Sequence, residues 1–163
     1  MGRQYKTITE VFDFGPHISK VILHVGRSLK GAKLTENQFR VSVKRTAMSG
    51  EDFAWPVFMG EKPDDSMKGT LRITDLYVSD AEGSCVEDGE YITLCMYCDP
   101  REGLGSIIRF DGNFNVTVNT AYKIVQLVPI ETGADTLEGL VFDENGGNRF
   151  YLRGTSADCS TPT

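Results

Sequence analysis

Few side chains in this sequence could carry out acid–base or nucleophilic chemistry. His17 and His24 are its two histidines, the imidazoles that could act as bases near neutral pH. His17 follows a proline in an expected turn and His24 is expected to face outward from a strand, so we interpret both as surface or packing residues. The nearest match to the Gly-x-Ser-x-Gly motif of serine hydrolases, residues 154–158, lacks the last glycine. We therefore predict no catalytic residue and no enzyme activity for this chain itself.

The cysteines and acidic residues do not form a recognisable metal site. Cys95 and Cys98 have the spacing of half a zinc site, but residues three apart on a strand point to opposite faces, and Cys85 and Cys159 stand alone. Cys98 is most simply a small core residue. The acidic segment 80–90 could offer oxygen ligands to calcium, but it lacks the spacing of an EF-hand, and we favour a solvated hairpin loop. We predict no metal and no cofactor.

An aromatic group is the other candidate for binding. Phe53, Trp55 and Phe58 lie within a few residues of each other, and aromatic platforms hold sugars in many β-sandwich modules. Pro56 favours an edge strand or an irregular segment, so the group could instead cover a sheet edge or contact a neighbouring domain. Packing is the favoured interpretation, and a carbohydrate-binding module that uses Trp55 is kept as the alternative function.

Composition and charge exclude several classes of partner. The chain has 163 residues, with 17 Lys and Arg against 23 Asp and Glu, and its net charge of -6 repels phosphate backbones and anionic membranes. We therefore predict no nucleic-acid partner. No run approaches the roughly 20 apolar residues that span a bilayer, and the N-terminus carries no signal peptide. We predict no membrane insertion.

Alternation of apolar and polar residues is the strongest structural signal. In residues 39–45 the apolar side chains of Phe39, Val41 and Val43 alternate with polar ones, which predicts a half-buried strand. Residues 19–25 repeat the pattern and place Lys20 and His24 on the outer face. Turn-forming clusters separate these runs, and no comparable helical pattern is present. The sequence therefore predicts an all-β, immunoglobulin-like antiparallel β-sandwich. Further strands are expected in residues 70–78, 91–98 and 122–128.

The end of the sequence predicts the limits of the domain. Residues 137–142 and 149–153 are expected to pair as a hairpin around an Asn-Gly turn in residues 143–148. The fold then covers residues 5–153 as one domain. Residues 154–163 are small and polar, and we expect a flexible tail or the start of a linker to a catalytic domain.

Several ordered segments resemble a known family. Residues 5–16 with 20–23, then 39–45, 72–80, 89–94 and 122–124, are similar in order and pattern to the N-terminal immunoglobulin-like domain of bacterial EstA-type esterases. The resemblance implies an accessory module that precedes an α/β-hydrolase domain in the same chain and supports that domain or the assembly of a homo-oligomer. It also implies an extracellular or cell-surface location. No catalytic residue of the family falls within this sequence.

An interaction module needs a contact surface. The expected outward face of the strands contributes Ile22, His24 and Leu76, and an exposed apolar side chain on such a face is a candidate contact. The complete candidate surface is Ile22, His24, Phe53, Trp55, Phe58 and Leu76.

Overall fold

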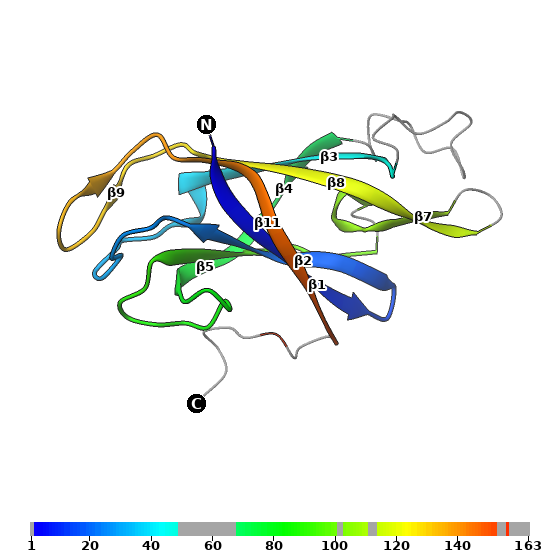
Figure 1. The fold of residues 1–163 in the computed structure, drawn as a ribbon, viewed down its shortest axis with the longest axis horizontal. Helices are drawn as coiled ribbons and strands as arrows, with labels where there is room; N and C mark the ends of the chain where they lie inside the picture. Colours follow the sequence, from blue (N-terminus) through cyan, green and yellow to red (C-terminus); the bar gives the residue numbers. More distant parts are fainter. Residues whose placement is uncertain (1, 49–67, 101–102, 111–113, 153–155, 157–163) are drawn as a thin grey trace.

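The computed structural model describes residues 2–48, 68–100, 103–110, 114–152 and 156 (Figure 1). These residues form strands and two short 3-10 helices, and none of their helices has the length and apolar character that crossing a bilayer requires. The elements in chain order are β1 (Arg3–Phe12), β2 (Gly15–His24), η1 (Glu36–Gln38), β3 (Phe39–Ala47), β4 (Lys68–Leu71), β5 (Ile73–Ser79), β6 (Tyr91–Met96), η3 (Gly103–Gly105), β7 (Ile108–Phe110), β8 (Asn115–Gln126), β9 (Ile130–Glu131), β10 (Thr136–Leu137) and β11 (Val141–Leu152).

The strands build one curled sheet around an apolar core. Its order is β4-β3-β8-β11-β1-β2-β6-β5, with β7 added to β8, and β9 and β10 form a small separate hairpin. The sheet curls (Figure 1), and strands near its two ends, such as β3 and β6, contribute side chains to the same core. The arrangement confirms the expected all-β immunoglobulin-like fold. Among the described strands β1 and β11 are the one parallel pair.

β3 shows why the alternating pattern folds in this way. Phe39, Val41 and Val43 are 4%, 0% and 3% exposed and belong to the core cluster. Arg40 and Lys44, at the positions between them, are exposed. Burying each apolar side chain stabilises the fold by about 1.5–3 kcal/mol, so the strand keeps the register with β8 that turns these side chains inward.

The expected hairpin in residues 137–153 is wrong. β11 is one continuous strand from Val141 to Leu152, and it pairs with β1 through most of this length. The Asn-Gly pair lies inside the strand, where the register with β1 shifts between Tyr5 and Thr7. Gly147 adopts a φ of 136°, and its N–H donates to Asn145 Oδ1 at 2.9 Å. The glycines therefore form an irregularity within a strand, because pairing with β1 continues beyond them.

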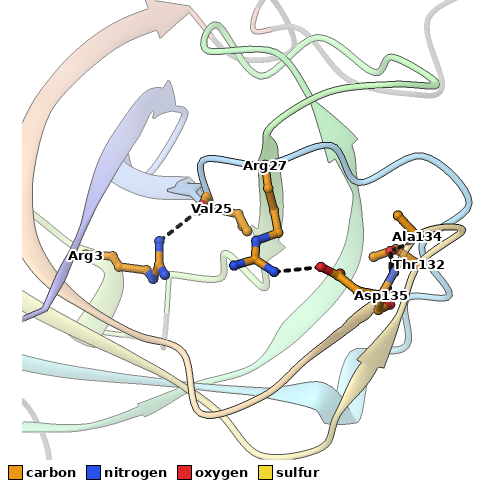
Figure 2. Close-up of polar contacts among 6 residues, drawn as sticks. All are labelled: Arg3, Val25, Arg27, Thr132, Ala134 and Asp135. Carbon is orange, nitrogen blue, oxygen red and sulfur yellow. Dashed lines mark hydrogen bonds and ion pairs between the residues drawn. The ribbon is translucent and has the colours of Figure 1, made fainter.

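Polar contacts tie the chain together at the end of the molecule where β1 begins. Arg3 Nη1 donates to the carbonyl of Val25 at 2.8 Å, and Arg27 Nη1 contacts Asp135 Oδ2 at 2.8 Å (Figure 2). The Arg27–Asp135 pair joins the segment after β2 to the β9–β10 hairpin. Its two side chains are 49% and 48% exposed, so the pair stabilises the fold by at most about 1 kcal/mol.

Candidate functional site

His17 lies in an aromatic environment at the start of β2. Its side chain is 4% exposed, and its ring meets those of Phe12 and Phe14 edge-on, with centroids 6.4 and 4.9 Å away. Within the described part of the chain Nδ1 has no hydrogen-bond partner. Burial lowers the pKa of His17, and Arg45 lowers it further, whereas Asp99 opposes the shift. The imidazole is therefore neutral at neutral pH.

The stability of the domain is expected to depend on pH through His17. Because the pKa of the folded state is below the unfolded value of 6.5, the unfolded chain takes up a proton first as the pH falls. The contribution is fully present above the unfolded pKa and is lost as the pH falls through the folded pKa. His17→Gln is expected to flatten the decline in unfolding free energy that begins as the pH falls below about 7, measured by urea denaturation at a series of pH values. An unchanged pH profile in this variant would contradict the assignment.

His24 lies on the surface at the end of β2, as the alternation predicted. Its ring stacks on Tyr91 of the neighbouring β6, with centroids 4.7 Å apart and planes inclined by 17°. The described structure shows no hydrogen bond from the ring of His17 or His24 to a serine or cysteine side chain. Neither imidazole is thus placed as the base of a nucleophile within this part of the chain.

The cysteines fall into two groups. Cys95 and Cys98 form no disulfide and are half-buried, and burial, with a smaller effect of Glu10, raises the pKa of Cys98 to about 12. The thiol of Cys98 therefore stays protonated, and it donates weakly to the carbonyls of Ile18 and Met96. Cys85 is disulfide-bonded, so the interpretation of this residue as standing alone is wrong. The sequence spacing carried no signal for this bond.

The acidic segment 80–90 folds back over the outer face of the sheet. A Cβ atom at Gly83 would lie 3.3 Å from Ile22 Cδ1, and the Gly83 carbonyl accepts a hydrogen bond from Tyr77 Oη at 2.7 Å. Because the segment covers it, Ile22 is only 3% exposed. Ile22 does lie on the outer face, as expected, but the prediction that it is exposed is wrong. Periodicity along one strand cannot show that a later loop covers its outer face.

Three carboxylates of this segment make polar contacts in the described structure. Asp80 Oδ1 accepts from the N–H groups of Glu82 and Ser84, and Asp88 Oδ1 accepts from Ser28 Oγ. Glu82 forms an ion pair with Arg149 of β11. Within the described ranges no group of three or more His, Cys, Asp or Glu side chains is arranged to hold a metal ion. Asp80 thus closes the loop, Asp88 attaches it to the segment after β2, and Glu82 attaches it to β11.

A buried polar cluster lies on the outer face of β1 and β2. We call it the Glu10 cluster, and its members are Glu10, Ser19, Lys20 and Ser156, which are 5–6% exposed. Glu10 Oε1 accepts from Ser19 Oγ at 2.6 Å and from Ser156 Oγ at 2.9 Å, and Lys20 Nζ donates to Ser156 Oγ at 2.7 Å. The expected exposure of Lys20 is therefore wrong.

The local structure of β2 explains how the cluster forms. The register with β1 passes from Ile8↔Lys20 to Thr9↔Ile18, so Ser19 is an extra residue that turns toward Glu10. Ser156, the one described residue of segment 154–163, follows β11 in the chain and contributes its hydroxyl group to the cluster. A serine beside a lysine can be a nucleophile and its base, but here the ammonium group donates to the hydroxyl, and the hydroxyl donates to Glu10. The cluster therefore anchors Ser156.

A pocket of about 250 Å³ lies between β1, β11 and the segment 80–90. Gly146 and Gly147 leave room for it because they carry no side chains, and the exposed Glu82–Arg149 pair stands beside it. Its described lining contains no histidine, serine or cysteine, and the one hydroxyl group in it, that of Thr7, donates to Asn148 Oδ1 at 2.6 Å. The lining residues are Lys6, Thr7, Ile8, Ile22, Ala81, Glu82, Gly146, Gly147, Asn148 and Arg149.

The predicted contact surface does not assemble as one patch among the described residues. His24 is exposed, Leu76 is half-buried against the core, and Phe53, Trp55 and Phe58 lie outside the described residues. Several exposed apolar side chains were not predicted from the sequence, among them Val11, Phe150 and Leu152. The alternation in residues 149–153 carried a signal for the last two, since Phe150 and Leu152 share one side of a strand.

The curled sheet, its core and its described polar contacts define an immunoglobulin-like β domain. A family model described as "Esterase Ig-like N-terminal domain" matches residues 4–139, and the chain belongs to this family. Among solved structures it is similar to one titled "Crystal Structure of a Thermostable Esterase", with a TM-score of 0.68 and 22% identity. The similarity covers 90% of this chain and 35% of that esterase. A comparison with curated proteins gave no match.

Proposed function

We propose that this chain is a non-catalytic accessory domain of a larger esterase, and that it packs against the α/β-hydrolase domain of the same polypeptide. The observation that carries the proposal is the family match over residues 4–139 to an N-terminal esterase domain. The similarity to 35% of a thermostable esterase supports it, because the greater part of that protein lies outside the matched region. The described histidines fit a structural role, since one is packed among aromatic rings and the other stacks on a surface tyrosine.

An extracellular or cell-surface location is part of the proposal. The disulfide bond of Cys85 supports it, because disulfides persist in oxidising compartments and are rare in the cytosol. Non-reducing peptide mapping of the protein isolated from its native host, after the free thiols have been alkylated, tests this point. A fully reduced Cys85 in that material would contradict the location.

The accessory role can be tested with the complete gene product. Three proteins are compared for hydrolysis of p-nitrophenyl acetate: the complete product, a version without residues 1–153, and the 163-residue chain. We expect turnover by the complete protein, none by the 163-residue chain, and less by the shortened version, because the catalytic domain loses its packing partner. Light scattering on the same samples shows whether the domain also assembles copies of the enzyme.

Two results would overturn the proposal. One is ester hydrolysis by the 163-residue chain that is abolished by His24→Ala or Ser156→Ala. The other is a shortened protein with the same activity, the same number of subunits and the same thermal stability as the complete product, since a domain that packs on the catalytic domain must alter at least one of these.

A further inference from the structure

The pocket beside β11 is opened by the irregularity in that strand. Opposite Lys6 of β1, β11 has two residues, Gly146 and Gly147, that have no register partner. An extra residue in one strand interrupts the ladder of hydrogen bonds at that point. A Cβ atom added at Gly147 would meet no atom within 4 Å, so the space beside its backbone is open. The acidic segment forms the opposite wall of the pocket.

The side-chain acceptors in the described lining already have donors. Asn148 Oδ1 accepts from Thr7 Oγ1 at 2.6 Å and from Thr9 Oγ1 at 2.9 Å. The two carboxylate oxygens of Glu82 accept from the guanidinium group of Arg149. Each amide and carboxylate oxygen of these side chains is therefore engaged within the domain.

Two donor groups of the lining remain available to a ligand. In the described part of the chain the half-buried Lys6 forms no hydrogen bond and no ion pair. Both threonine hydroxyls contact Oδ1 of Asn148, and its Nδ2 has no partner among the same residues. Because Arg149 is paired with Glu82, the lining carries one uncompensated positive charge, in a chain whose net charge is -6.

Free donors without free acceptors select an anion. A sugar hydroxyl or a neutral amide brings hydrogens that need acceptors, whereas a carboxylate only accepts hydrogen bonds. Its single negative charge matches the single unpaired ammonium group, and the volume of about 250 Å³ admits a small molecule. Ile8, Ile22 and Ala81 make part of the lining apolar, which suits a short alkyl group.

We propose that this pocket binds a small alkyl carboxylate. The carboxylate group lies between Lys6 Nζ and Asn148 Nδ2, and the alkyl group contacts Ile8 and Ile22. Charge-assisted hydrogen bonds are stronger than neutral ones, so Lys6 contributes most to the binding of the anion. The assignment does not rest on the proposed function, although ester hydrolysis releases anions of this class.

Titration of the 163-residue chain with sodium butyrate tests the site, with amide chemical shifts followed by NMR at constant ionic strength. We expect saturable shifts in residues 6–8, 81–82 and 146–149. For a ligand of this size in a partly exposed pocket, the dissociation constant is expected on the order of 1 mM. Shifts that grow linearly with concentration and never saturate would overturn the proposal.

Three variants locate the binding. Lys6→Met removes the charge, keeps an unbranched side chain and is expected to weaken butyrate binding at least about fivefold. Ala81→Leu is expected to abolish saturable binding, because the larger side chain occupies the pocket. Lys33→Met is the control, since it makes the same change in net charge at an exposed position outside the lining. Thermal melts confirm that each variant is folded. Unchanged binding in a folded Lys6 or Ala81 variant, or an equal loss in the control, would overturn the site.

Four further ligands define the chemical class. Butyramide has the shape of butyrate without its charge and is expected to bind at least about tenfold more weakly. Methyl glucoside and inorganic phosphate are expected to give no saturable shifts. N-acetylglutamic acid α-amide presents a carboxylate on a peptide backbone and is expected to bind more weakly than butyrate. Equal or tighter binding of the amide, the sugar or the phosphate would overturn the carboxylate assignment. Tighter binding of the glutamate derivative would identify a protein side chain as the occupant and overturn the proposal as well.

Discussion

Replacing Phe142 with alanine is expected to lower the free energy of unfolding by about 3–5 kcal/mol. Phe142 is 0% exposed and is among the largest fully buried side chains. It also lies where β11 contacts both of its neighbours, since its register partners are Ile124 of β8 and Arg3 of β1. The cavity would therefore open at the junction between the β3–β8 part of the sheet and the β1–β2 part, where neighbouring strands cannot easily close it.

Urea denaturation of the purified domain measures this effect. Phe150→Ala is the matched control, because it removes the same side chain from the same strand at a position that is 63% exposed. The control is expected to change the unfolding free energy by less than about 1 kcal/mol. Equal losses in the two variants would contradict the central position assigned to Phe142.

Glu10→Ala is expected to cost about 2–4 kcal/mol of unfolding free energy. The substitution leaves the hydroxyl groups of Ser19 and Ser156 without their carboxylate acceptor and leaves the ammonium group of Lys20 inside the cluster. Buried donors that lose their acceptor cost more than the hydrogen bonds contributed, because water cannot replace it.

Two further variants serve as controls for the Glu10→Ala result. Ser19→Ala removes a single donor and is expected to cost about 1 kcal/mol, and Glu138→Ala, at an exposed position, is expected to have almost no effect. Limited proteolysis adds a second measurement: cleavage after the fold, near residue 156, is expected to accelerate in Glu10→Ala and to remain slow in Glu138→Ala. A Glu10 variant as stable as Glu138→Ala would show that the cluster contributes nothing.

Local alternation was sufficient for the strands whose burial depends on one face. β3 follows its pattern, with Val41 and Val43 inside and Lys44 outside. The burial of its apolar area fixes the register, so the register of this strand can be inferred from its own sequence. The all-β class and the family resemblance could accordingly be inferred before any coordinates were known.

The contacts that sequence analysis missed join segments far apart in the chain. Ser156 reaches Glu10 across 146 positions, and the segment that covers Ile22 begins at residue 80. Neither contact leaves a periodic signal in the sequence. A residue on the outer face of a strand is predicted to be exposed unless the covering segment is known. The hairpin turn predicted from the Asn-Gly pair is wrong for a related reason. Such a pair can also form an irregularity inside a strand when pairing with the partner strand, here β1, continues past it.

The parallel pairing of β1 with β11 has a mechanical consequence. Because the two strands run in the same direction, Arg3 and Leu152 lie at opposite ends of the pair, with Arg3 beside Phe142 and Leu152 beside Val11. Tension applied through the two ends of the domain would slide one strand along the other, and the hydrogen bonds between them would share the load instead of opening in succession. We expect the domain to behave as a stiff tether under force.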